Sequence, residues 1–77
     1  MHELALMDDL VTAVAAEVGD ARVVAVRLEV GCLSAALPHA LRFCFDVAAR
    51  GTALEGAALE IEETNGDELR LKEVQVT

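Results

Sequence analysis

Near the start of the chain, apolar residues recur at the spacing of one helical face. They are Leu4, Met7, Leu10, Val11, Val14, Ala15 and Val18. Polar residues such as Asp8, Asp9 and Glu17 occupy the other faces, so the pattern predicts an amphipathic helix that packs through one stripe. We expect the helix to end at Gly19, because glycine favours the conformation that terminates helices.

The next segment alternates with a period of two and predicts a β-strand from Arg22 to Val30. One face of this strand is wholly apolar and consists of Val24, Val26, Leu28 and Val30. The opposite face contains Arg27 and Glu29, so we expect strong burial on one side only. Gly31 interrupts the alternation, and residues 31–37 are predicted to form a loop.

A second helix is predicted to open at Pro38, since proline in the first helical turn loses no hydrogen bond. Its apolar positions are Leu41, Phe43, Cys44, Phe45, Val47 and Ala48. Arg50 would lie favourably in the last turn, and Gly51 would end the helix. Because both aromatic residues of the chain lie here, we expect this helix to carry the centre of the core.

Two further segments, 59–62 and 68–72, alternate between charged residues and leucine or isoleucine, which is typical of strands. Between them lies the segment 64–67, whose Asn65-Gly66 pair is typical of a type I′ turn. The two strands are therefore predicted to pair with each other as an antiparallel hairpin.

The final valines, Val74 and Val76, are out of phase with the leucines that precede them. A bulge near Lys72-Glu73 would return the valines to the buried side. The full order, α-β-α-β-β, predicts an α+β fold in which two helices pack on a small three-stranded mixed sheet. The strand–helix–strand unit at its centre is expected to be a right-handed crossover.

Composition restricts the class of protein. With 77 residues and 55% hydrophobic side chains we expect a single packed domain. Two Phe and neither Trp nor Tyr make its core light, and formation of a homodimer would reinforce it. The net charge of −8 repels phosphate backbones and anionic lipids, so we expect neither nucleic acid nor membrane as partner. Because no spanning segment or signal peptide is recognisable, we expect a cytoplasmic protein.

Catalytic motifs are not recognisable either. Cys32 and Cys44 lack the spacing of a zinc or redox motif, so we interpret both as small apolar residues and expect no zinc. The sequence has no nucleophile elbow, phosphate-binding loop or HExxH motif. Cys32 and His39 as a nucleophile–base pair would lack a third, orienting group. We therefore do not expect an enzyme.

A histidine at the second position offers clearer chemistry. The α-amine of Met1, the deprotonated amide nitrogen of His2 and the His2 imidazole can bind one ion. This planar, strong-field donor set suits Ni(II) or Cu(II) better than Zn(II), and Glu3 can add its amide nitrogen or its carboxylate. Two alternatives stay open at this point: a frayed surface histidine, and copper, which binds such sites more tightly than nickel.

Short segments in order along the whole chain resemble the HypA/HybF nickel metallochaperones. They are Met1-His2-Glu3-Leu4, Val26-Arg27-Leu28-Glu29-Val30-Gly31, Leu33-Ser34, Pro38-His39-Ala40-Leu41-Arg42-Phe43, Gly51-Thr52, Gly56-Ala57, Leu59-Glu60-Ile61 and Gly66-Asp67-Glu68-Leu69-Arg70-Leu71-Lys72. The resemblance implies delivery of Ni(II) to the maturing large subunit of NiFe-hydrogenase and, in some organisms, to urease. It implies two partners, a nickel-binding GTPase of that pathway and the hydrogenase large subunit precursor. It also implies that Met1, His2 and Glu3 form the nickel site.

Two departures from the family's pattern bear on this function. The family carries a zinc-binding domain between what are here the last two strands, whereas this sequence has only a turn near 64–67, so residues 1–77 would form a single nickel-binding domain. Leu37 stands where many members have a carboxylate, which lies beside nickel in some of them. Two hypotheses follow: nickel delivery without control by a zinc domain, or a truncated member that acts as a protein-interaction module without metal delivery.

Overall fold

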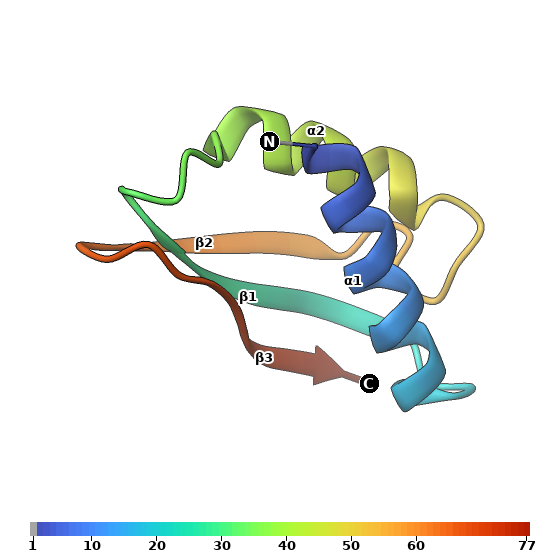
Figure 1. Ribbon diagram of the computed structural model, residues 1–77. Coiled ribbons are helices and arrows are strands. Elements are labelled where there is room, and N and C mark those ends of the chain that lie inside the picture. The colour runs from blue at the N-terminus through green and yellow to red at the C-terminus, as the bar shows by residue number, and fades with distance from the viewer. Residues whose placement is uncertain (1) are drawn as a thin grey trace.

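The five elements follow one another in the predicted order. They are α1 (Glu3–Val18), β1 (Val23–Gly31), α2 (Pro38–Ala49), β2 (Ala58–Thr64) and β3 (Leu69–Val76). In this computed structural model, which describes residues 2–77, both helices cover one face of a three-stranded mixed sheet (Figure 1). The predicted α+β class is confirmed.

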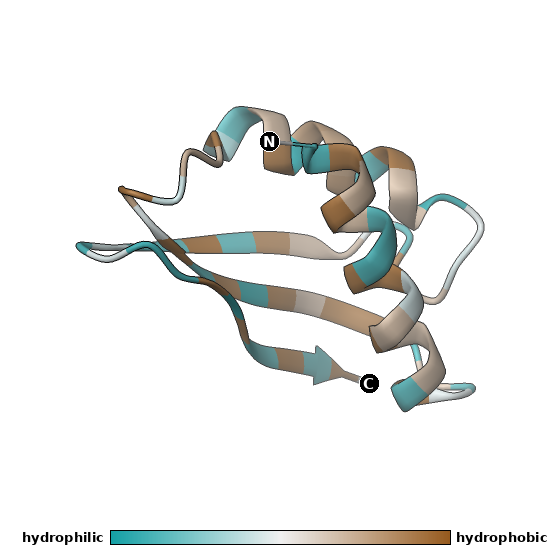
Figure 2. Ribbon diagram, in the orientation of Figure 1, coloured by the Kyte–Doolittle hydropathy of each residue, from teal (hydrophilic) through white to brown (hydrophobic). Residues whose placement is uncertain are grey.

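The core lies between the helices and the sheet, where hydrophobic positions of α1 and α2 face those of β1 (Figure 2). Its largest fully buried side chains are Phe45, Met7, Leu28, Leu41, Leu54 and Val26. Each of the two helices and the central strand contributes to this set. Burial of these side chains against one another is the main source of stability in so small a domain.

The two aromatic residues have different environments. Phe45 is 1% exposed, but Phe43 is 70% exposed, so only one of the two aromatic residues expected to contribute to the core lies in it. Two residues turn an α-helix through about 200°, so these side chains point to nearly opposite sides of α2. The end of the helix also differs slightly: Arg50 is the C-cap and does not lie in the last turn, whereas Gly51 has a positive φ of 77°.

The sheet order corrects one prediction. β1 lies between the other two strands, parallel to β2 and antiparallel to β3, so β2 and β3 do not pair as a hairpin. β1 is the most deeply buried strand, and the central position lets both of its edges form hydrogen bonds. Neither Asn65 nor Gly66 has the positive φ that a type I′ turn requires. Parallel pairing of β1 with β2 through α2 agrees with the predicted crossover.

The connection between β2 and β3 crosses the end of β1 and is hydrogen-bonded to it. The amides of Gly31, Cys32 and Leu33 donate to the carbonyls of residues 68, 64 and 66, at 2.7, 2.9 and 2.9 Å. Gly31 is thus the last residue of β1 and not part of the predicted loop. These three bonds take the place of the expected hairpin ladder.

Gly31→Ala should therefore destabilise the domain. A Cβ atom at residue 31 would lie 2.1 Å from the carbonyl oxygen of Gly66, and both backbones are held by hydrogen bonds. We expect the free energy of unfolding to fall by about 1–3 kcal/mol, the typical cost of overpacking, as measured by urea denaturation. The control is Gly66→Ala, whose Cβ would have the carboxyl end of the Glu68 side chain, and not a backbone atom, as its nearest neighbour and should cost less. Equal losses in the two variants would contradict this explanation.

β1 departs from simple alternation at its start. Val23 is 4% exposed, whereas Val24, predicted to be buried, is 44% exposed. The pairing with β3 shifts register between Val23 and Ala25, so the buried and exposed faces exchange there.

A second register shift confirms the predicted bulge in β3. Arg27 pairs with Glu73 and Leu28 pairs with Leu71, so Lys72 is the extra residue. The bulge lets Val74 pack against the core, as expected. Val76 beyond it is 46% exposed, so its predicted burial is wrong.

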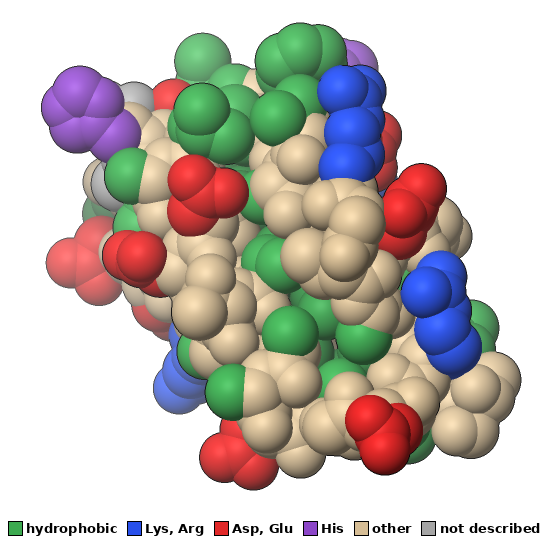
Figure 3. Space-filling model, turned by 90° about the vertical axis from the view of Figure 1, so that its right-hand side faces the viewer, with side chains coloured by type: hydrophobic (Ala, Val, Ile, Leu, Met, Phe, Trp, Pro, Cys, Tyr) green, Lys and Arg blue, Asp and Glu red, His purple; other side chains and the backbone are tan. Residues whose placement is uncertain are grey.

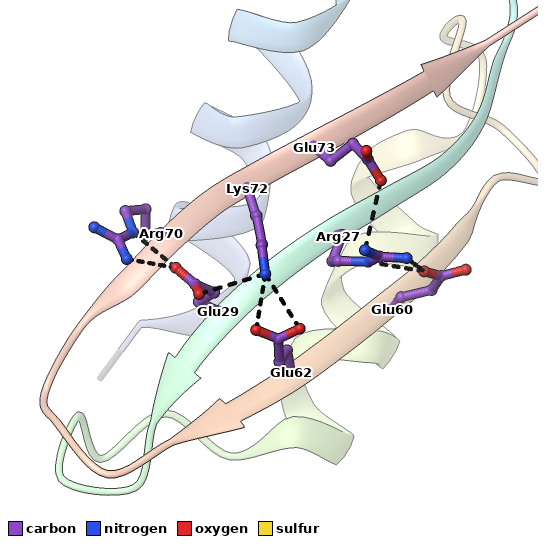
Figure 4. Close-up of polar contacts among 7 residues, drawn as sticks. All are labelled: Arg27, Glu29, Glu60, Glu62, Arg70, Lys72 and Glu73. Atoms are coloured by element: carbon purple, nitrogen blue, oxygen red, sulfur yellow. Dashed lines mark hydrogen bonds and ion pairs between the residues drawn. The ribbon is translucent and has the colours of Figure 1, made fainter.

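The face of the sheet away from the helices is charged. Seven side chains interact there: Arg27, Glu29, Glu60, Glu62, Arg70, Lys72 and Glu73 (Figure 4). The Lys72 ammonium lies 3.0 Å from Glu62, and its hydrogen bond lowers the pKa of that carboxyl. Glu29 lies 2.6 Å from Arg70 and raises the pKa of the guanidinium. Exposed pairs of this kind contribute little to stability, but they leave each cation on this face matched to a carboxylate.

Candidate metal centre

The described part of the chain begins at His2, which is the N-cap of α1 and is exposed. The amide of Leu6 donates to the His2 carbonyl at 3.1 Å, which closes the first helical turn. The His2 side chain makes no capping hydrogen bond, so the imidazole is not committed to holding the helix. Met1, the third predicted site residue with His2 and Glu3, lies outside the described residues.

The main-chain nitrogens at this end of α1 are available for chemistry. The first N–H groups of an α-helix have no carbonyl one turn earlier to bind. The amides of His2 and Glu3 belong to this set, so neither is consumed by the helical hydrogen-bond ladder. Either nitrogen could therefore lose its proton to a metal without breaking a helical hydrogen bond.

A depression of about 560 Å³ adjoins these groups and is wide open to solvent. It lies between the start of α1 and the middle of α2, and its lining residues are His2, Glu3, Leu4, Ala5, Asp8 and Cys44. Figure 3 shows a face of the molecule on which a histidine and several carboxylates border hydrophobic side chains. The depression thus brings together an imidazole, carboxylates and a thiol.

These side chains do not themselves form a ready cage. Across residues 2–77, no three His, Cys, Asp or Glu side chains are arranged to hold a metal ion. Main-chain amide nitrogens are the further donors beside the His2 imidazole, and nitrogen donors of this kind suit Ni(II) or Cu(II).

The other candidate residues are dispersed. Cys32 is exposed and Cys44 is half-buried, and both are free thiols. His39 is exposed in the first turn of α2, and neither it nor Leu37 lines the depression. Sequence reasoning had not connected Asp8 or Cys44 with His2, because Cys44 reaches the depression only through the packing of α2 on α1.

Comparison with known proteins identifies the family. The sequence model of the family described as "Hydrogenase/urease nickel incorporation, metallochaperone, hypA" matches residues 1–69. The chain belongs to the HypA family. His2 and the amides beside it that make no helical hydrogen bond therefore belong to a chain whose family is described as acting in nickel incorporation.

Curated relatives agree with this assignment. The chain is 48% identical to the hydrogenase maturation factor HypA of Nostoc punctiforme, over 86% of this chain and 58% of that protein. It is 53% identical to HypA of Roseiflexus sp., over 82% of this chain and 54% of the relative. For HypA of Geobacter metallireducens the values are 44%, 86% and 60%. The chain thus spans little more than half the length of these relatives.

Within residues 2–77, neither α1 nor α2 combines the length and the apolar character needed to cross a bilayer.

Proposed function

We propose that this domain binds Ni(II) at its N-terminus and delivers it for maturation of NiFe-hydrogenase or urease. The observation that carries the proposal is His2 at the open start of α1, in a chain of the HypA family. The family's description as a nickel-incorporation metallochaperone supports the choice of nickel over copper. The domain acts as a carrier in the cytoplasm and not as an enzyme, with nickel as its cargo.

The proposed ligands are the α-amine of Met1, the amide nitrogen and imidazole of His2, and a donor from Glu3. Amine, deprotonated amide and imidazole nitrogens favour a planar arrangement, which a d⁸ ion such as Ni(II) accepts readily and Zn(II) does not. Binding displaces protons from these donors, so nickel affinity should rise with pH. The exposed depression beside His2 leaves the ion open to exchange with a second protein.

The proposed partners are the nickel-binding GTPase of the maturation pathway and the hydrogenase large subunit precursor. They follow from family membership, and the sheet face of Figure 4 is a poor candidate for their docking because its charges already pair with one another. We further propose that the turn near 64–67 stands where other members insert a zinc-binding domain. The hydrogen bonds between this connection and the end of β1 show how the sheet is completed around so short a connection.

Extending the N-terminus tests the proposal. Native protein should bind about one Ni(II) per chain with the absorption bands of a planar complex, because the α-amine closes the chelate. Two residues added before Met1 remove that amine and should abolish the bands. The matched control carries the same two residues after Thr77 and should bind like the native protein. Equal nickel binding by the N-terminally extended protein would rule out the site.

A second candidate function, an interaction module without metal delivery, is favoured by exposed apolar side chains. Leu33, Leu37 and Phe43 are 72%, 64% and 70% exposed. If this alone were the function, nickel would not bind to the native protein, and binding to the GTPase would survive substitution of His2. This alternative would be excluded if the native protein bound nickel and if transfer of that nickel to the precursor required His2.

A further inference from the structure

We propose that the outer edge of β3 binds a second copy of the chain, whose own β3 pairs with it as an antiparallel strand. β3 lies at one end of the strand order β2-β1-β3, and among residues 2–77 no strand or helix lies beyond it (Figure 1). An uncovered edge offers unpaired N–H and C=O groups to another strand. At the other end of the sheet, Arg42 of α2 already donates a hydrogen bond to the Leu59 carbonyl of β2. β3 is therefore the more accessible edge.

The apolar surface along β3 favours association. Leu71 and Val76 are 42% and 46% exposed, although both are large hydrophobic residues. A groove of about 200 Å³ lies between α1 and β3. Its lining residues, apolar apart from one glutamate, are Ala13, Val14, Glu17, Val18, Leu71 and Val74. A second β3 would place apolar side chains beside the open side of this groove, and their removal from water would stabilise the pair.

The directions of the main-chain groups restrict how a second strand can pair. The amide of Gly31 donates to the Glu68 carbonyl, and the amide of Thr77 donates to the Arg22 carbonyl, so residues 68 and 77 face β1. Residues of an antiparallel strand alternate between bonding to one neighbour and bonding to the other, and the bulge adds one residue at Lys72. The residues whose main-chain groups point outward are therefore Leu69, Leu71, Val74 and Val76.

One antiparallel register, centred on a two-fold axis at the bulge, pairs all of these groups. Leu71 then lies opposite Val74 of the second copy, and Leu69 lies opposite Val76 of the second copy. The extra residue of one bulge faces the extra residue of the other, so the spacing of the outward groups matches. A strand without a bulge would be out of step with this edge.

The charges on β3 select the same register. Lys72 lies opposite Glu73 of the second copy, and the two-fold axis repeats this pair. Both side chains are partly exposed, at 44% and 62%, and opposite charges directly across a strand pair attract. A shift by one residue in either direction would place Lys72 opposite Lys72 or Glu73 opposite Glu73, which is repulsive.

These features favour a closed dimer over open-ended association. A bulge and a lysine usually protect an edge strand from pairing, and here they exclude every strand that does not match them. A two-fold interface uses the same surface on both copies, so no β3 edge is left for a third. The net charge of −8 on each chain opposes contact through less complementary surfaces.

A charge-exchange experiment tests the interface. Sedimentation of the native protein from about 10 μM to about 1 mM should show a monomer–dimer equilibrium with no larger species. Lys72→Glu and Glu73→Lys, each checked for its fold by circular dichroism, should weaken self-association about 10-fold, because like charges then face each other. An equimolar mixture restores both opposite-charge pairs and should form a heterodimer with near-native affinity. The control for charge alone is Asp9→Lys, an exposed position on α1, which should dimerise like the native protein.

Amide hydrogen exchange gives a second measurement that needs no variant. The amides of Leu71 and Val74 point outward, so their exchange should slow as the protein concentration rises, while exchange in β2 stays constant. A native protein that remains monomeric to about 1 mM would overturn the proposal. Concentration-dependent protection of β2 or α2 in place of β3 would also overturn it, and so would a mixture that associates no better than the single variants. None of these measurements involves nickel, so their outcome is independent of the proposed function.

Discussion

Replacing His2 with alanine is expected to abolish planar nickel binding while leaving the fold intact. The substitution removes the imidazole, one of the donors that make the site planar and strong-field. Loss of an outer-shell partner already costs about 10- to 100-fold in metal affinity, and loss of a direct ligand should exceed that. The His2 side chain is exposed and makes no capping hydrogen bond, so the free energy of unfolding should change by less than about 0.5 kcal/mol.

His39→Ala is the matched control for this prediction. His39 is also exposed and also lies at the start of a helix, but it does not line the depression. Titrations followed by absorption in the d–d region and by equilibrium dialysis should show native affinity for His39→Ala and none of the planar bands for His2→Ala. If the two variants bound nickel equally, the ion would have to be placed elsewhere in the protein.

The order and class of the elements could be predicted because they depend on local pattern. The helical spacing of Met7, Val11 and Val14 is reproduced as the buried face of α1. Pro38 and Gly51 could be recognised as the limits of α2 because their effects on a helix depend only on residues within one turn. The bulge at Lys72 could also be predicted from the sequence, because the alternation of apolar and polar residues shifts by one position within that strand.

The pairing of the strands could not be predicted in the same way. Asn65-Gly66 is a strong local signal for a hairpin, but sheet order depends on which strand gains most from the central position. β1 is buried along most of its length, whereas most of β2 and β3 is exposed, so β1 separates them. The connection at 64–67 then adapts to the end of β1 and does not adopt its locally preferred turn.

The sequence could identify only those residues of the candidate site whose chemistry follows directly from their position in the chain. His2 and Glu3 were identified because a histidine at the second position brings its imidazole, its amide nitrogen and the α-amine of Met1 within reach of one ion, to which Glu3 can add a donor. Asp8 was assigned only to a polar face, since its relation to His2 depends on the depression formed with α2. Phe43 was misplaced because an apolar residue on a helix gives no sign of which side the sheet will cover.

Phe45→Ala is expected to produce the largest loss of stability among substitutions in the core. Phe45 is the largest fully buried side chain and is 1% exposed, between α1, α2 and the sheet. Removing a buried aromatic ring typically costs about 3–5 kcal/mol through lost transfer free energy and the cavity left behind. A domain of 77 residues has a total stability on the order of 4–12 kcal/mol at the usual value per residue, so the loss is a large share of it.

Phe43→Ala on the same helix supplies the control, because it removes the same ring from a side chain that is 70% exposed. Urea denaturation should place its free energy of unfolding within about 0.5 kcal/mol of the native value. Phe45→Leu keeps the site apolar and should lose on the order of 1 kcal/mol, which remains measurable if Phe45→Ala is too unstable to fold. Similar losses for Phe43→Ala and Phe45→Ala would mean that both rings are buried in solution and that the outer face of α2 is covered, as it would be in a homodimer.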